Sequence, residues 1–100
     1  MKKKQHEDTP IARILGEVEH VFVRKHEDYG PKNISESPFG PMRGVLTRMY
    51  DKQARAVNLI DKDSHNFESL EDTFIDMIGY SIVALMVLRG EWPGVKKGDM

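Results

Sequence analysis

The sequence predicts an all-α protein built from three main helices. Apolar residues recur at the three- and four-residue spacing that lines one face of a helix in three segments, 10–27, 41–60 and 69–89. Residues typical of helix ends bound these segments, and no segment alternates apolar and polar residues as a half-buried strand would. A chain of 100 residues has room for one domain. We expect that domain over residues 9–90, between a flexible N-terminal tail at 1–8 and a C-terminal tail at 91–100.

The first helix is predicted from Thr9 to about Glu27. Thr9 supplies a hydroxyl at the N-cap, and Pro10 suits the first helical position because its missing N–H would have no partner there. One apolar stripe then follows, made of Ile11, Ile14, Leu15, Val18 and Phe22. The helix should end before Gly30-Pro31, because proline disfavours helical backbone in the residue before it.

A loop and a second helix follow. Residues 30–44 contain three prolines and three glycines, and a connection of this length inside a small domain is often functional. The second helix should begin at about Pro41 or Met42 and run to Ile60. Its apolar stripe, interrupted by one polar residue, consists of Met42, Val45, Leu46, Met49, Gln53, Ala56, Val57 and Ile60.

The third helix is predicted to be capped by Ser69, with Asp72 completing an acidic variant of the capping box, and to end at Gly90. Within it, every residue from Ile82 to Leu88 is apolar. A helix that is apolar on all sides should be buried on all sides. Three helices of this size cannot cover one of their own completely, so we expect a second copy of the chain to complete the bundle in a homodimer or homotetramer.

Composition narrows the classes of function. Lysine and arginine number 15 against 16 aspartates and glutamates, a balance unlike the basic excess of proteins that bind duplex nucleic acid. The chain has no cysteine, so disulfides, thiolate catalysis and cysteine-bound zinc are excluded. The basic start lacks the apolar stretch of a secretory signal, and the longest apolar run is too short to span a bilayer. These features predict a cytoplasmic protein without a membrane segment.

Asp72 and Asp76 form the sharpest chemical signal. Four residues apart on a helix, they share one face, which continues through Gly79, Tyr80 and Val83 toward the core. Like charges on successive turns repel, so the pair needs a cation. Magnesium, which prefers carboxylate, phosphate and water oxygens, would suit it. In the alternative interpretation, Asp72 serves the helix terminus and Asp76 faces water.

A basic edge on the second helix is the second signal. Arg48, Lys52 and Arg55 fall on one side of the helix, and Asp51 lies beside them. They could form a phosphate clamp of three cations with one further carboxylate for the metal. Alternatively, they form a solvated face with weak local ion pairs.

The first loop supplies candidates for contact with a nucleoside. Tyr29 could stack on a base, Asn33 could read its edge, and Lys32 adds a cation. We group Tyr80 of the acidic face with them. In the alternative interpretation, the segment is an ordinary helix end followed by a turn, which Gly30-Pro31 would explain.

Three blocks of sequence together resemble the nucleotide-modification-associated family, which is common in phages and related to the MazG-like all-α NTP pyrophosphohydrolases. The blocks are Lys25-His26-Glu27-Asp28-Tyr29-Gly30, then Gly44 through Arg55 with its Arg-x-x-Asp-Lys-x-x-Arg core, then Glu68-Ser69-Leu70-Glu71-Asp72-Thr73 followed by Asp76 and Tyr80. The resemblance covers about residues 11–90. MazG-like enzymes carry Glu-Glu-x-x-Glu on one helix and Glu-x-x-Asp on the next, where this chain has Arg48-x-x-Asp51 and Asp72-x-x-x-Asp76.

The resemblance implies a helical bundle completed by dimerisation. It also implies cleavage of a nucleoside triphosphate to monophosphate and pyrophosphate with magnesium, or alternatively manganese. On this hypothesis Asp51, Asp72 and Asp76 hold the metal, and Arg48, Lys52 and Arg55 neutralise the phosphates. Glu68 would be the general base, with Arg48 also assisting catalysis. The alternatives are a protein that binds or sequesters nucleotides without cleaving them, and a purely structural dimer.

Overall fold

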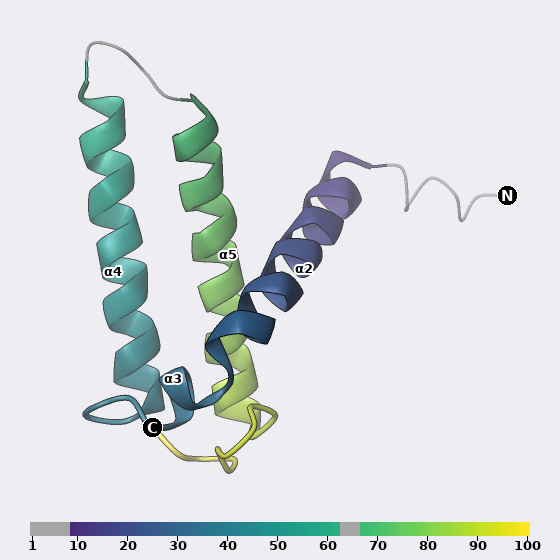
Figure 1. Cartoon of the computed structure of the whole chain (residues 1–100), viewed down its shortest axis with the longest axis vertical. Coiled ribbons are helices and arrows are strands. Elements are labelled where there is room, and N and C mark those ends of the chain that lie inside the picture. The colour runs from purple at the N-terminus through teal and green to yellow at the C-terminus, as the bar shows by residue number, and fades with distance from the viewer. Residues whose placement is uncertain (1–8, 63–66) are drawn as a thin grey trace, which may run out of the picture.

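The computed structural model describes residues 9–62 and 67–100, and this part of the chain is all-helical, with no strand. Its elements are α2 (Pro10–Tyr29), α3 (Lys32–Ser35), α4 (Pro41–Ile60) and α5 (Phe67–Arg89). Helices α4 and α5 lie side by side as an antiparallel pair, and α2 meets α5 at a slant (Figure 1). The all-α prediction is confirmed, and α3 is an additional turn of helix inside the predicted loop. The predicted tail at 1–8 lies outside the described residues.

Helix α2 begins and ends through the local signals that the sequence carries. The Thr9 hydroxyl accepts a hydrogen bond from the Ala12 N–H at 3.0 Å, and Pro10 occupies the first helical position. At the other end, Gly30 adopts a φ of 73° and donates its N–H to the His26 carbonyl at 3.0 Å. A positive φ is strained for most residues, so glycine is the natural stop here. The helix extends two residues past the predicted end at Glu27.

Tertiary contacts order the segment between α2 and α4. Ile34 of α3 is fully buried. The Pro31 carbonyl accepts a hydrogen bond from Trp92 Nε1 at 3.0 Å. The Asn33 carbonyl accepts two more, from Ser37 Oγ at 2.7 Å and from Arg48 Nη2 at 3.1 Å. The predicted loop is therefore held by Arg48 of α4 and by Trp92 of the C-terminal segment.

The predicted start of the third helix is wrong. Helix α5 already includes Phe67, so Ser69 lies inside the helix rather than at its N-cap. The Ser69 carbonyl accepts a hydrogen bond from Thr73 Oγ1, with 2.8 Å between the two oxygens, and both residues lie within the helix. Serine tolerates either position, because cap preferences amount to only about 1 kcal/mol. The predicted end is confirmed at Gly90, with a φ of 70°.

The core lies where α3, the start of α4, the end of α5 and the C-terminal segment meet, at the lower end of Figure 1. Its buried residues are Ile34, Met42, Val45, Val83, Val87, Trp92 and Val95. Residues 91–100 contain no helix, as expected, yet Trp92 and Val95 are buried. The segment predicted as a tail therefore contributes directly to the core.

The apolar stretch from Ile82 to Leu88 is only partly covered within one chain. Val83 and Val87 are buried, whereas Leu85 and Leu88 are each 47% exposed. The expected burial on every side is therefore not reached by the described part of a single chain. None of the helices described is long and apolar enough to cross a membrane.

Candidate functional site

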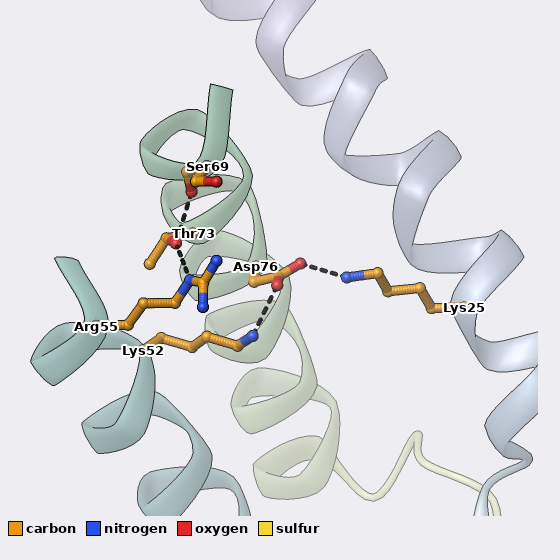
Figure 2. A network of polar contacts seen from close by, with 6 residues as sticks. All are labelled: Lys25, Lys52, Arg55, Ser69, Thr73 and Asp76. Atoms are coloured by element: carbon orange, nitrogen blue, oxygen red, sulfur yellow. Dashed lines mark hydrogen bonds and ion pairs between the residues drawn. The ribbon is translucent and has the colours of Figure 1, made fainter. Parts of the chain in front are cut away.

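Asp76 lies between two lysines that reach it from different helices (Figure 2). Lys25 Nζ of α2 is 2.8 Å from Asp76 Oδ1, and Lys52 Nζ of α4 is 3.0 Å from Oδ2. The Asp76 side chain is 13% exposed, against 48% for Lys25 and 29% for Lys52. A largely buried carboxylate thus has an ammonium group at each oxygen, and it joins α2, α4 and α5 at one point.

The lysines determine the charge state of the carboxylate. Burial alone would raise the pKa of Asp76, but the hydrogen bonds and charges of Lys25 and Lys52 outweigh burial and lower it. Likewise, burial would lower the pKa of Lys25, but its hydrogen bond to Asp76 and the carboxylate charge raise it. Asp76 is therefore ionised at neutral pH, and Lys25 is charged.

The structure shows what surrounds Asp76 of the acidic pair. The sequence predicts that Asp72 and Asp76 need a cation, and in the structure the chain supplies two ammonium groups to Asp76 itself. The alternative in which Asp76 faces water is wrong. Asp72 is exposed one turn away on α5, and both aspartates line the groove that is described below.

Arg55 is oriented by a residue that the sequence analysis did not identify. Its Nε donates to Thr73 Oγ1 at 3.1 Å, and Thr73 in turn donates to the Ser69 carbonyl at 2.8 Å (Figure 2). Thr73 is only 1% exposed. A buried hydroxyl of this kind fixes the direction of the guanidinium and is itself satisfied as donor and acceptor.

Two adjoining cavities meet at Asp76. A groove on one side is lined from α2, α4 and α5 by apolar and charged side chains. The charged ones include Lys25, Lys52, Arg55, Asp72 and Asp76, and Glu17, His20 and Glu71 are exposed there; the apolar ones include Ile14, Phe74 and Ile78. A pocket on the other side shares Lys25, Lys52 and Asp76 and is otherwise lined mainly by Phe22, His26, Tyr29, Asn33, Gly79 and Tyr80. Three of the four predicted nucleoside contacts, Tyr29, Asn33 and Tyr80, therefore lie in one pocket.

The pocket contains two polar atoms without a partner. Asn33 Oδ1 and His26 Nδ1 are buried, and neither has a hydrogen-bond partner in the described part of the chain. The His26 ring packs against Phe22 and Trp92, with ring centroids 4.1 and 4.9 Å away. Burial lowers the pKa of His26, so its ring is neutral at pH 7. Buried polar atoms are usually satisfied, so these two are exceptions, and both belong to side chains that line the pocket.

The structure does not bring every predicted site residue to these cavities. Arg48 donates to the carbonyls of Gly44 and Asn33 and so supports the loop. Asp51, Glu68 and Lys32 are exposed and line neither the groove nor the pocket. Within residues 9–62 and 67–100, no group of three or more histidines and acidic residues is arranged to hold a metal ion.

Comparisons with known protein families, curated proteins and solved structures found no match to this chain. The family named from the order of three sequence blocks therefore remains a prediction. The site itself combines one largely buried carboxylate paired with two lysines, an arginine held by Thr73 in the same groove, and a neighbouring aromatic pocket whose lining includes two residues with unsatisfied polar atoms.

Proposed function

We propose that this chain binds a nucleoside triphosphate, with the base in the pocket and the phosphates in the groove, and hydrolyses it to a monophosphate and pyrophosphate. The observation that supports this most directly is that the pocket and the groove share Lys25, Lys52 and Asp76. One end of that continuous surface suits a planar polar ring, and the other suits an anion.

The base end has the features that a nucleobase requires. The Tyr29 and Tyr80 rings offer apolar surface for stacking. Asn33 and His26 line the same pocket and add polar side chains to it, although their Oδ1 and Nδ1 atoms are buried, so a base would reach those two atoms only after a small side-chain rotation. The backbone at Asn33 is held in place by the two hydrogen bonds that its carbonyl accepts.

The phosphate end combines Lys25, Lys52 and Arg55. Two flexible ammonium groups can follow the phosphate oxygens, whereas the guanidinium is held in one direction by Thr73. Such groups stabilise negative charge that develops when a phosphate bond breaks. The exposed acidic side chains of the groove face water, which weakens their repulsion of an incoming anion.

The hydrolytic part of the proposal needs a divalent cation, and two donors of the right kind are present. Asp72 and Asp76 lie on one wall of the groove, and magnesium is commonly held by one or two carboxylates together with substrate phosphates. Magnesium would supply charge neutralisation and an activated water at that place. Glu68, the general base predicted from the sequence, lies one turn before Asp72 but lines neither cavity, so we assign no residue of the groove to that role.

A second candidate is nucleotide binding without cleavage. It is favoured by the two ammonium groups on Asp76 and by the lack of a three-acid group among the described residues. Both candidates use the same pocket and groove and differ only in whether products are released.

Product analysis separates the two candidates. Purified protein incubated with magnesium and a panel of standard and modified nucleoside triphosphates should release pyrophosphate from at least one of them.

Arg55→Ala should weaken binding of the triphosphate at least tenfold but that of the matching nucleoside hardly at all, because its partner is phosphate. Arg43→Ala, an exposed arginine on the same helix, is the matched control. Binding without pyrophosphate would support sequestration, and equal loss of triphosphate and nucleoside would place Arg55 elsewhere.

We also propose that two copies of the chain associate through the exposed apolar side of α5. Leu85 and Leu88 are half exposed there, and burying such side chains is worth roughly 1–2 kcal/mol each. Light scattering should find a dimer or larger assembly at micromolar concentration, which Leu85→Glu should weaken. Leu46→Glu, at a similarly exposed leucine on α4, is the control. A monomeric wild-type protein would rule out this assembly.

A further inference from the structure

We infer that Lys25 and Lys52 are exchangeable counterions of Asp76, so that a divalent cation reaches this carboxylate only after a phosphate group has drawn the lysines away. The inference rests on the proposed function and adds an order of binding to it: the anion first, the metal second.

The geometry of the carboxylate is the first step. Its two oxygens are each in contact with a different ammonium group, at 2.8 and 3.0 Å, and the lysines approach from α2 and α4 (Figure 2). A metal ligand must offer at least one oxygen. An ammonium group and a divalent cation on the same oxygen would repel each other strongly at such short range. Direct binding of the metal to Asp76 therefore requires at least one lysine to leave.

The second step concerns which groups can move. Asp76 has a short side chain on α5 and is 13% exposed, so its position is largely fixed by the helix. Lys25 and Lys52 have long stems and are 48% and 29% exposed. Both already line the groove next to Asp76. A phosphate in that groove can thus attract the ammonium groups by side-chain rotation, and no helix has to shift.

The third step is thermodynamic. If an anion increases the affinity of Asp76 for a metal, the metal must increase the affinity for that anion by the same factor. At Asp76 itself two ammonium groups face one carboxylate, and this local excess of positive charge favours the anion as the first ligand, whereas the other acidic side chains of the groove, Glu17, Glu71 and Asp72, are exposed. Metal and phosphate would then bind as a coupled pair, and neither ion alone would occupy the site fully.

The test measures binding of manganese alone, by the loss of its free electron paramagnetic resonance signal, in buffer without phosphate or nucleotide. The wild-type protein should bind manganese weakly, whereas Lys25→Gln combined with Lys52→Gln should bind it about tenfold more tightly, within the usual range of coupling between sites. Adding Asp76→Asn to the double variant should remove that gain. Lys96→Gln, an exposed lysine in the C-terminal segment, should behave as wild type.

A second measurement examines the anion. In excess chelator, equilibrium dialysis with labelled nucleoside triphosphates should show binding to the wild type and at least tenfold weaker binding to the double lysine variant. If the double variant does not fold, Lys25→Gln alone serves, because that lysine is half exposed.

The outcomes separate the inference from the function on which it rests. Manganese binding to the wild type as tight as to the lysine variant would overturn the inference, even if nucleotides bind. Absence of triphosphate binding with and without metal would overturn the proposed function, while tighter manganese binding by the lysine variant would still support the counterion relationship.

Discussion

Replacing Trp92 by alanine should lower the free energy of unfolding by about 3–5 kcal/mol, a large fraction of the roughly 5–15 kcal/mol typical of a small domain. The indole is 5% exposed and belongs to the core cluster with Ile34 and Val87. Its ring also lies 4.9 Å from His26 between centroids. Alanine would leave a cavity where the C-terminal segment joins the helices. Urea unfolding followed by circular dichroism measures the change.

The conservative variant separates packing from hydrogen bonding. Trp92→Phe keeps an aromatic ring but removes the Nε1–H that donates to the Pro31 carbonyl, at a cost of about 1 kcal/mol for the bond. It should therefore be much less harmful than alanine. If Trp92→Ala unfolded at the wild-type urea concentration, residues 91–100 would not belong to the core.

The importance of Trp92 shows where sequence reasoning about this fold ends. Helix boundaries at Thr9, Gly30 and Gly90 could be predicted, because a cap depends on side chains and backbone within a few residues. Trp92 lies in a segment without periodicity, and its burial depends on contact with Pro31, which is 61 positions away in the chain. Only the folded arrangement brings those two residues together. Ser69 shows that local signals can also mislead, because a residue that suits an N-cap can lie within a helix.

The candidate site was predictable to a similar extent. The face carrying Asp72 and Asp76 and the edge carrying Lys52 and Arg55 follow from helical spacing, and they do line one groove. Lys25 was missed, although a signal existed: it lies three residues after Phe22 and so continues the apolar stripe of α2. A lysine on such a stripe needs a partner, and that partner, Asp76, is 51 residues away.

Asp76→Asn should abolish magnesium-dependent hydrolysis and the gain in nucleotide affinity that magnesium gives, and it should also destabilise the protein, by about 1–2 kcal/mol at neutral pH for two partly exposed ion pairs. The sequence alone suggests instead an unchanged or increased stability, through relief of repulsion from Asp72. The structure reverses that expectation, because the substitution removes the shared partner of Lys25 and Lys52. Thermal unfolding of both proteins without ligand measures the difference. Asp28→Asn, at an exposed aspartate of α2, should change stability by less than about 0.5 kcal/mol.

The pH dependence of this difference identifies its cause. The pKa of Asp76 is lowered in the folded protein, so its contribution is fully present above the ordinary carboxyl pKa of about 4 and is lost as the pH falls through the folded value. The stability gap between wild type and Asp76→Asn should therefore be widest near neutral pH and should close progressively in acid. A gap that persisted in acid would point to a packing defect rather than a lost charge. If Asp76→Asn kept both wild-type stability and full magnesium-dependent activity, neither the ion pairs nor the metal would depend on this carboxylate. The proposed site would then have no demonstrated role for Asp76, the carboxylate that lines both the groove and the pocket and pairs with Lys25 and Lys52.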